Sequence, residues 1–521
     1  MRNLLLIAIC VFFCQLTKAQ NEFITIWQPG IITTPAVNVI APFQANSNQI
    51  WFPGTGQNYT ISWEEIGFPQ HNGIMTNVTS NGQVLVDFGT PSKEDGLNTT
   101  YRVKVSNGNS VFQQIKFASH QTFNPIIETH VPNLQMLGSA DKLLEIEQWG
   151  NIAWTSMNAA FANCQRMQLT STDSPNLTNV IDASLMFYLT NSFSGASSMQ
   201  NWDTSNIQNF SFMFAKHYIT QIYQPATFPF NPPQLSSWDT SSATNLSYMF
   251  TGNSYFNQNL NSWNVSNVKN MSWMFAFCSA YNQPLNDWNT SNLQNMHNIF
   301  ISTSSFNQSL SDWNTTNVTN MNRAFANSTQ FNQPLNFWNM SNVTTMTNIF
   351  DNASSFNQSL ANWNLASLVN AQGAFANSAL DCENYSKTIT GWADNPNTAN
   401  NVSLILISPM KYASNVVDKR NILVNKGWNI VGDSLGSCVL STSEIKTSEN
   451  SSIYPNPVSD FIRIKNLKNT ANYKISDVSG RLLKEGKVVS EIVDVSVLPK
   501  GNYLLQLITN ENTLNFKFIK N

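Results

Sequence analysis

The sequence predicts a modular protein: a central solenoid of the leucine-rich-repeat kind, flanked by N-terminal and C-terminal β-sandwich domains. The prediction follows from a 25-residue period in the middle of the chain and from alternating, strand-like segments before and after it. The 521 residues leave room for several domains. We expect residues 1–19 to be a signal peptide, 20–137 an immunoglobulin-like β-sandwich, 138–440 the solenoid with its caps, 441–452 a linker and 453–521 a small β-sandwich.

The first 19 residues have the features of a secretory signal peptide. Arg2 precedes an apolar run over residues 4–13, and cleavage is expected after Ala19. This run is too short to cross a bilayer, and no later run of 18 apolar residues follows it. We therefore expect an exported protein without a membrane span.

Residues 20–137 contain short strand-like segments with Gly, Pro and Asn between them. The six segments are Phe23 to Trp27, Val37 to Ile40, Tyr59 to Trp63, Val84 to Phe88, Tyr101 to Val105 and Val111 to Phe117. Short strands separated by turn residues are typical of an immunoglobulin-like sandwich. No cysteine lies in this region, so no disulfide would join its two sheets.

The 25-residue unit keeps its register through six consecutive tryptophans and phenylalanines. These are Trp238, Trp263, Trp288, Trp313, Trp338 and Trp363, and Phe250, Phe275, Phe300, Phe325, Phe350 and Phe375. Stacked coils bury the same apolar side chain at each level. Within one unit, the spacing of Val268, Met271, Met274 and Phe275 predicts a short helix, and the alternation around Leu260 predicts a short strand.

Asparagine and glutamine recur in the same register. Their columns are Asn257, Asn282, Asn307, Asn332 and Asn357, followed by Gln258, Gln283, Gln308, Gln333 and Gln358. Stacked amides can bond to the backbone and to the amide of the neighbouring coil. We interpret these columns as structural rather than functional.

An insertion in the repeats is a first candidate binding surface. Trp202 and Trp238 are 36 residues apart, which is one period plus 11, and the surplus falls near residues 221–231. Insertions in repeats form loops on one face, which is often the binding face. The candidate residues are Tyr223, Phe228 and Phe230; the alternative is a loop that folds onto its own scaffold.

A second candidate surface is a column that varies between constant neighbours: Phe212, Tyr248, Trp273, Asn298, Arg323 and Asn348. Variable positions on a helix should face solvent, and exposed Tyr, Trp and Arg often act as binding anchors. We therefore name Tyr248, Trp273 and Arg323 as candidates. The alternative is that each side chain packs on the neighbouring coil.

Four cysteines remain after the signal peptide. Cys164 and Cys278 share a column four coils apart, about 19 Å at ~4.8 Å per coil, which is beyond the ~7 Å limit for a disulfide. We expect them to be buried thiols. Cys382 and Cys438 flank the last, irregular part of the solenoid, where a disulfide would close the C-terminal cap of an exported protein.

The C-terminal region differs from the repeats in composition. It holds 10 of the 27 Lys and Arg residues of the chain. Its alternating segments, such as Phe461 to Ile464 and Tyr503 to Leu507, predict strands, and the turn residues between them favour a small β-sandwich.

Two resemblances follow from these residues. The unit F-N-Q-x-L-x-x-W-N-x-S-N-V-x-N-M-x-x-M-F resembles the BspA-type leucine-rich repeats of Bacteroidetes surface proteins, over about residues 140–435. The tail resembles the C-terminal sorting domain of type IX secretion, through Tyr454-Pro455-Asn456-Pro457, Asp477 to Gly480 and Leu498-Pro499-Lys500-Gly501-Asn502-Tyr503. The resemblances imply export to the cell surface or medium, the type IX machinery as a partner of residues 453–521, and adhesion to a protein or glycan ligand on host or neighbouring cells.

Composition and motifs argue for some function classes and against others. Only 11% of the residues are charged and the net charge is -3, which argues against binding of nucleic acid. The five histidines are scattered and no hydrolase or P-loop motif appears. Glu64 with Glu65, and Glu145 with Glu147, are interpreted as solvated charges. We therefore expect an adhesin without catalytic residues, cofactor or metal; the alternatives are a self-associating structural surface protein and, less favoured, a hydrolase.

Overall fold

The structure is a computed structural model. It describes residues 21–31, 39–40, 45–120, 132, 134–216, 229–438, 452–454, 458–465, 467, 471–477, 481–488, 491–509 and 513–520. The predicted signal peptide lies outside these residues. Among the residues described, no helix has the length and apolar character needed to cross a membrane. The chain forms two compact units, Met1–Val439 and Leu440–Asn521.

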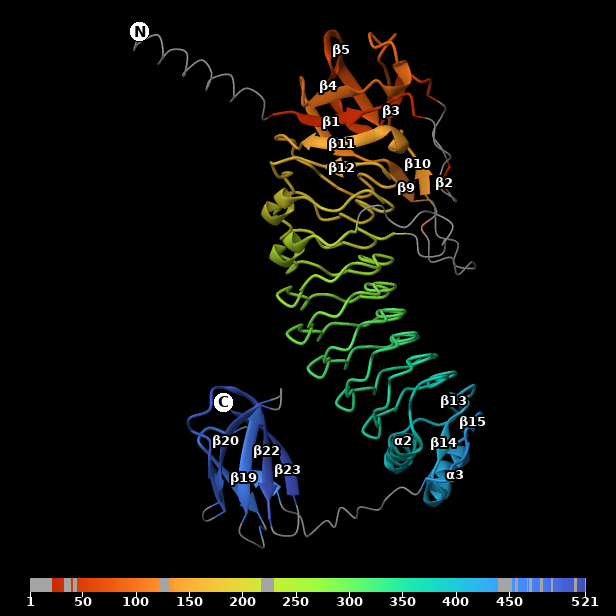
Figure 1. The fold of residues 1–521 in the computed structure, drawn as a ribbon, viewed down its shortest axis with the longest axis vertical. Coiled ribbons are helices and arrows are strands. Elements are labelled where there is room, and N and C mark those ends of the chain that lie inside the picture. The colour runs from red at the N-terminus through yellow and green to blue at the C-terminus, as the bar shows by residue number, and fades with distance from the viewer. Residues whose placement is uncertain are drawn as a thin grey trace. The chain divides into compact units, whose positions relative to one another are not determined.

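The first unit begins with a β-sheet domain (Figure 1). Its large sheet has the order β12-β11-β1-β7-β4-β5, with β8 paired to β4. The strands are β1 (Phe23–Trp27), β4 (Gly54–Glu65), β5 (Phe68–Asn81), β7 (Tyr101–Ser106), β8 (Val111–Ile115), β11 (Leu143–Gln148) and β12 (Gln168–Leu169). Two small sheets pair β3 (Gln49–Phe52) with β6 (Val84–Asp87), and β10 (Leu134–Met136) with β2 (Val39–Ile40) and β9 (Ala118–His120). The immunoglobulin-like subtype stays a prediction.

Aromatic side chains hold the β-sheet domain together. The ring of Trp27 on β1 lies 6.1 Å from that of Phe52 on β3, and Phe52 lies 6.1 Å from Phe112 on β8. All three side chains are buried. The β3–β6 pair therefore packs on one face of the large sheet.

The large sheet continues directly into the repeats. β11 pairs antiparallel with β1 and parallel with β12, so two strands of the first coils extend the N-terminal sheet. The next coils continue the parallel pairing through isolated bridges, from Ala153↔Asn176 onwards. The sheet thus crosses the position near residue 137 where the sequence places a domain boundary.

The regular repeats that follow the first coils contain neither the predicted helix nor the predicted strand. Between η4 (Pro233–Ser237) and α2 (Cys382–Asp394), a stretch that the structure describes throughout, the coils consist of turns and isolated parallel bridges. The bridges join Asn245, Asn270, Asn295, Asn320, Thr345 and Asn370 in sequence. The expectation of a short strand plus a short helix in each coil was wrong.

The backbone hydrogen bonds explain why no helix forms. The amides of Met271, Trp273 and Phe275 donate to carbonyls of the next coil, at 2.9–3.0 Å. The amides between them, of Met274 and Ala276, donate to the carbonyl three residues back. Every second amide is thus used between coils, which leaves none for a helical i→i−4 ladder. Apolar residues spaced 3 and 4 apart, such as Val268, Met271 and Phe275, are buried in this coil, as they would be on one face of a helix.

The predicted columns form the core of the solenoid. The rings of Phe275, Phe300 and Phe325 stack with centroids 5.6 Å apart from coil to coil. The Asn-Gln columns are structural, as interpreted: the Asn282 side-chain oxygen accepts from the Asn307 amide and from Gln308 Nε2, both at 3.0 Å. Each coil is therefore tied to the next by backbone, aromatic and amide ladders.

The solenoid ends in a cap that contains the two long helices of the described chain. The cap contains α2, β13 (Ser403–Leu404), β14 (Lys411–Tyr412), η5 (Ser414–Val416), α3 (Val417–Asn425), β15 (Asn429–Ile430) and β16 (Ser434–Leu435). Asn384 of α2 takes the place of the ladder glutamine, because its Nδ2 donates to Asn357 Oδ1 at 2.9 Å. A disulfide joins Cys382 to Cys438, the pair named from the sequence, with Cα atoms 6.2 Å apart.

The second unit is a C-terminal β-sheet domain. One sheet contains β17 (Ser452–Tyr454), β18 (Phe461–Lys465) and β21 (Ile492–Asp494). The other contains β20 (Leu482–Lys487), β19 (Asn472–Asp477), β22 (Gly501–Ile508) and β23 (Thr513–Lys520). Inward-facing residues of both sheets, such as Ile462, Ile475, Leu505 and Phe518, share one hydrophobic core.

Candidate binding surfaces of the repeat region

Two columns of exposed asparagines run along the coils beside the buried tryptophans. The first column follows each tryptophan directly and contains Asn264, Asn289, Asn314 and Asn339; the second lies three residues further on and contains Asn267, Asn292, Asn317 and Asn342. All eight side chains are exposed. We call them the asparagine face.

Hydrogen bonds fix the orientation of these amides. Asn289 Oδ1 accepts from the Ser291 amide at 3.1 Å, which is an Asx turn, and Asn292 Nδ2 donates to the Ser266 carbonyl of the previous coil at 2.7 Å. The same two bonds recur in the following coils, for example from Asn314 and Asn317. The remaining amide donors and acceptors therefore face solvent in a fixed, repeated array.

The asparagine face was not predicted from the sequence. Its signal is an N-x-[ST]-N string that follows four successive tryptophans, Trp263, Trp288, Trp313 and Trp338. Asparagine also fills the structural ladders, so the sequence alone does not separate the exposed columns from the laddered ones.

The residues predicted in the insertion do not form an exposed site. Tyr223 and Phe228 lie outside the described residues. Phe230 is buried, and its ring lies 4.7 Å from that of Phe214 and 6.2 Å from that of Phe256. Within the described residues, the insertion thus contributes a core aromatic to the phenylalanine columns.

The variable column is a row of turn residues with left-handed backbone. Its φ angles are +58° at Phe212, +60° at Tyr248, +62° at Trp273 and +52° at Arg323. Tyr248 is half-buried and stacks on Phe212 at 4.1 Å, Trp273 is buried and stacks on Tyr248 at 5.4 Å, and Arg323 is exposed. The aromatic members pack on the neighbouring coils, so only Arg323 presents its side chain to solvent.

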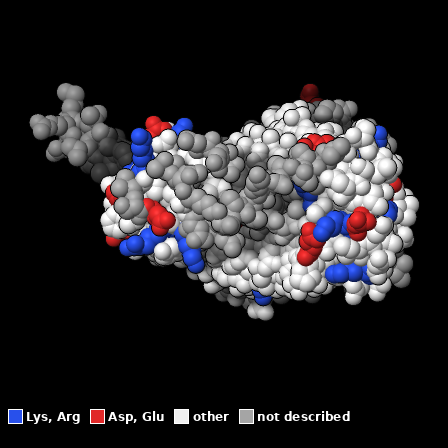
Figure 2. Space-filling view, turned by 90° about the horizontal axis from the view of Figure 1, so that it is seen from below, with Lys and Arg blue, Asp and Glu red and all other residues white. Residues whose placement is uncertain are grey.

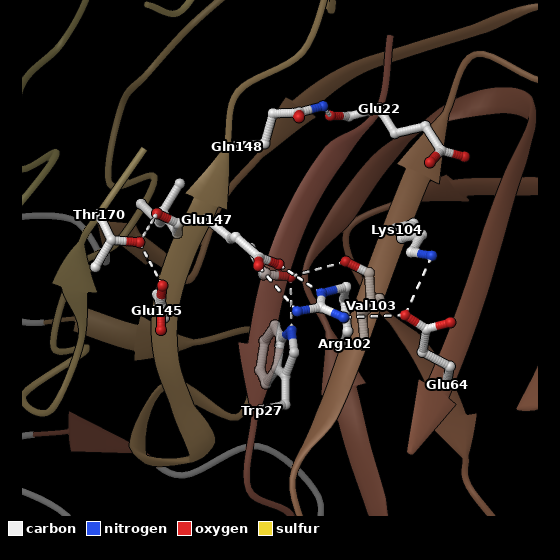
Figure 3. Close-up of polar contacts among 12 residues, drawn as sticks. Glu22, Trp27, Glu64, Arg102, Val103, Lys104, Glu145, Glu147, Gln148 and Thr170 are labelled. Atoms are coloured by element: carbon white, nitrogen blue, oxygen red, sulfur yellow. Dashed lines mark hydrogen bonds and ion pairs between the residues drawn. The ribbon is translucent and has the colours of Figure 1, made fainter. Parts of the chain in front are cut away.

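Charged side chains gather in the N-terminal sheet, where they are paired (Figure 3). The Arg102 guanidinium contacts Glu147 Oε2 at 2.6 Å and Glu64 Oε1 at 3.1 Å, and Lys104 contacts Glu64 at 3.3 Å. Burial raises the pKa of Glu64, but its bonds to Arg102 and Lys104 outweigh this effect and lower it. This network joins β4 and β7 to β11 and acts structurally.

Glu65 is buried rather than solvated, which corrects the expectation for this carboxylate. It pairs with His71 Nδ1 and accepts from the backbone amides of Ser92 at 2.8 Å and Lys93 at 3.0 Å. Burial alone would raise its pKa, yet the hydrogen bonds hold the pKa below the ordinary value. An anionic Glu65 at the end of β4 is thus held by β5 and by the loop that contains Ser92 and Lys93.

The described residues offer no arrangement for metal or thiol chemistry. No group of three or more His, Cys, Asp or Glu side chains among them could hold a metal ion. The free thiols of Cys164 and Cys278 are buried, and burial raises the pKa of each. Figure 2 shows uncharged surface between small groups of acidic and basic side chains. Only 11% of the residues of the chain are charged, which favours contacts with neutral groups.

Comparison with known proteins identifies two parts of the chain. Residues 155–221, 218–304 and 284–392 match a family described as a Mycoplasma protein of unknown function, DUF285. Residues 452–521 match the secretion system C-terminal sorting domain. No curated protein matches the chain.

The chain is therefore a secreted repeat protein with a C-terminal sorting domain. More particularly, its central region consists of DUF285-type repeats, and its last domain directs it to the type IX secretion machinery, which implies a secreted or cell-surface location.

Proposed function

We propose that the repeat region binds an extracellular ligand through the asparagine face and that the protein acts as an adhesin. The observation that carries this proposal is the fixed orientation of exposed amides in successive coils, exemplified by Asn289 and Asn292. A rigid array loses little conformational entropy when it binds. Many weak contacts along the coils would then add up through multivalency.

A neutral glycan is the ligand class that fits this face. Amide groups can donate to and accept from hydroxyl groups, and the eight asparagines themselves carry no charge. The exposed charged residues close to them in sequence, Lys269, Asp287 and Asp312, include both signs. The resemblance to BspA-type surface repeats also supports adhesion. We propose in addition that the protein has no catalytic activity, because its paired carboxylates serve ion pairs and its thiols are buried.

Arg323 can add a contact beside this array, since it is exposed. Tyr248 and Trp273 stack on each other at least two coils away from Arg323, so we assign them no direct contact with the ligand. The proposal therefore moves the predicted binding role from the aromatic side chains to the amides.

Substitution of three successive asparagines by aspartate tests the proposal. In N289D/N314D/N339D each side chain keeps the oxygen that accepts in the Asx turn but loses its amide donors and gains a charge. The matched control is N327D/N352D/N377D, which changes three exposed asparagines of another column in three successive coils. These positions have φ of +58°, +57° and +54°, which Asp tolerates nearly as well as Asn.

Binding of the secreted protein would be measured on arrays of neutral and charged glycans and of extracellular-matrix proteins. We expect saturable binding to a neutral glycan, lost in N289D/N314D/N339D and kept in the control. Equal loss in both variants, or no binding of the wild type to any glycan, contradicts the proposal. Binding only to matrix proteins would replace the glycan by a protein ligand.

A further inference from the structure

β5 is the end strand of the large sheet and is long for an edge. It spans 14 residues, Phe68–Asn81, and pairs only with β4 on its inner side. In the described part of the chain, no other strand pairs with its outer edge. Figure 1 shows β5 at the border of the N-terminal domain. The outer edge therefore presents backbone donors and acceptors that could pair with an added strand.

The strand has no charged residue to protect its edge, although the β4–β5 pair contains three register shifts. Proteins block exposed edges with Lys, with other charged residues, with Pro or with bulges. Residues 68–81 contain no Lys, Arg, Asp or Glu, and their single proline, Pro69, is at the start. The register shifts between β4 and β5 leave a regular stretch in which Asn72, Gly73, Ile74 and Met75 pair with Glu64 to Ile61. Over these four residues the inner edge of β5 is regularly paired, which leaves the outer edge free of local irregularity for a partner strand.

An exposed isoleucine lies at the centre of this stretch. The side chain of Ile74 is 66% exposed, which is high for a large apolar residue within a strand. Asn72 and Thr76, two residues away on either side, are also exposed. Along this face, Asn72 thus presents an amide, Ile74 an apolar side chain and Thr76 a hydroxyl.

We infer that a second copy of the chain pairs with β5, antiparallel, about a two-fold axis at Ile74. This register places Ile74 opposite Ile74 and Asn72 opposite Thr76 of the other copy. The Ile74 side chains of the two copies then contact each other, and each Asn72 amide lies opposite a Thr76 hydroxyl. No like charges lie opposite one another. Pairing of identical strands about a two-fold axis is an isologous contact, which closes as a dimer and does not extend into a fibre.

The inner face also fits this register. Gly73 lies over the indole of Trp63, where a Cβ would come within 2.6 Å of ring atoms, so this position has no side chain. The two-fold pairing puts Met75 of the second copy opposite Gly73. Its flexible side chain would fill the space left beside Gly73, next to the buried indole of Trp63.

The test compares two exposed isoleucines in the whole secreted protein. I74K places a charge at the centre of the edge, and I181K is the matched control, because Ile181 is 57% exposed and lies outside β5. Sedimentation and light scattering should show a concentration-dependent dimer for the wild type and I181K, and a monomer for I74K. Circular dichroism checks that both variants are folded.

Cysteine substitution tests the register itself. Opposed residues of an antiparallel pair have Cβ atoms about 4.5–5.5 Å apart, close enough for mild oxidation to join I74C to I74C. I181C should remain uncrosslinked. A monomeric wild type at on the order of 100 times the concentration used for binding assays, or a dimer unaffected by I74K, overturns the inference. Glycan binding that survives in I74K would show that the asparagine face works independently.

Discussion

The indole Nε1 of Trp313 donates to the carbonyl oxygen of Leu285 at 2.9 Å, from one coil to the coil before it. The same bond joins Trp288 to Leu260 at 2.8 Å and Trp338 to Leu310 at 3.0 Å. Each tryptophan thus fills the core and also satisfies a buried carbonyl of its neighbour. The column is constant because it performs both tasks at once.

The substitution W313F should separate the packing role of this tryptophan from its hydrogen bond to the neighbouring coil. Phenylalanine keeps most of the apolar volume but removes the donor, so the Leu285 carbonyl keeps only its longer bond from the Trp288 amide, at 3.4 Å. We expect the free energy of unfolding to fall by about 0.5–1.5 kcal/mol. Denaturant unfolding followed by circular dichroism measures this loss. Q330A changes an exposed residue and should have little effect; an equal loss in Q330A would show that the indole bond does not matter.

Asn307 tests the amide ladder. Its Oδ1 accepts from the Asn332 amide at 2.9 Å and from Gln333 Nε2 at 3.0 Å. N307A removes this acceptor and should destabilise the protein by about 0.5–1.5 kcal/mol, whereas N307D keeps it and should lose less. Hydrogen exchange should report faster opening at the Asn332 amide in N307A only. Equal exchange in both variants would argue against the ladder.

The substitution G391A should have opposite effects on helix propensity and on packing. Alanine is favoured over glycine within a helix by about 1 kcal/mol, so α2 alone should gain. A Cβ on Gly391, however, would lie 2.2 Å from the Ala361 carbonyl oxygen and 2.6 Å from its Cα. Backbone cannot move aside cheaply, so we expect a lower melting temperature. K387A lies on the exposed side of the same helix and should leave it nearly unchanged.

The lowered pKa of Glu65 predicts how the stability of the protein depends on pH. Its pKa is lowered in the folded protein from an ordinary value of 4.5. Its contribution to stability is therefore complete above pH 4.5 and is lost as the pH falls through the lowered pKa.

The melting temperature of the wild type should consequently drop below pH 4.5 more steeply than that of E65Q. E94Q removes an exposed carboxylate and should keep the wild-type slope. If E65Q and the wild type lose stability in parallel on acidification, Glu65 does not carry this dependence.

The architecture of the repeats could be predicted because register is visible in sequence. Trp313 and Phe325 recur every 25 residues, so their burial in stacked columns follows from the period alone. The local conformation could not be predicted. Trp273 and Arg323 adopt positive φ, which neither residue favours, because bonds to the next coil hold them there.

The candidate site was harder to predict than the core. Trp273 occupies a variable position, which suggested exposure, but stacking on Tyr248 buries it. Asn292 and Asn307 are the same residue type and recur with the same 25-residue period, but in different columns. One projects from the asparagine face and the other bridges coils, and only the three-dimensional path of the coil distinguishes them.

The backbone ladder begins at β11 and β12 and ends where Asn370 bridges to Ser403 of the cap. Between Asn245 and Asn370, each coil bridges both to the coil before it and to the coil after it. A duplication or deletion of 25 residues would thus insert or remove one layer and leave both ends intact. The molecule can change its reach by about 4.8 Å per layer, so its length can be adjusted in evolution without redesigning either terminal domain.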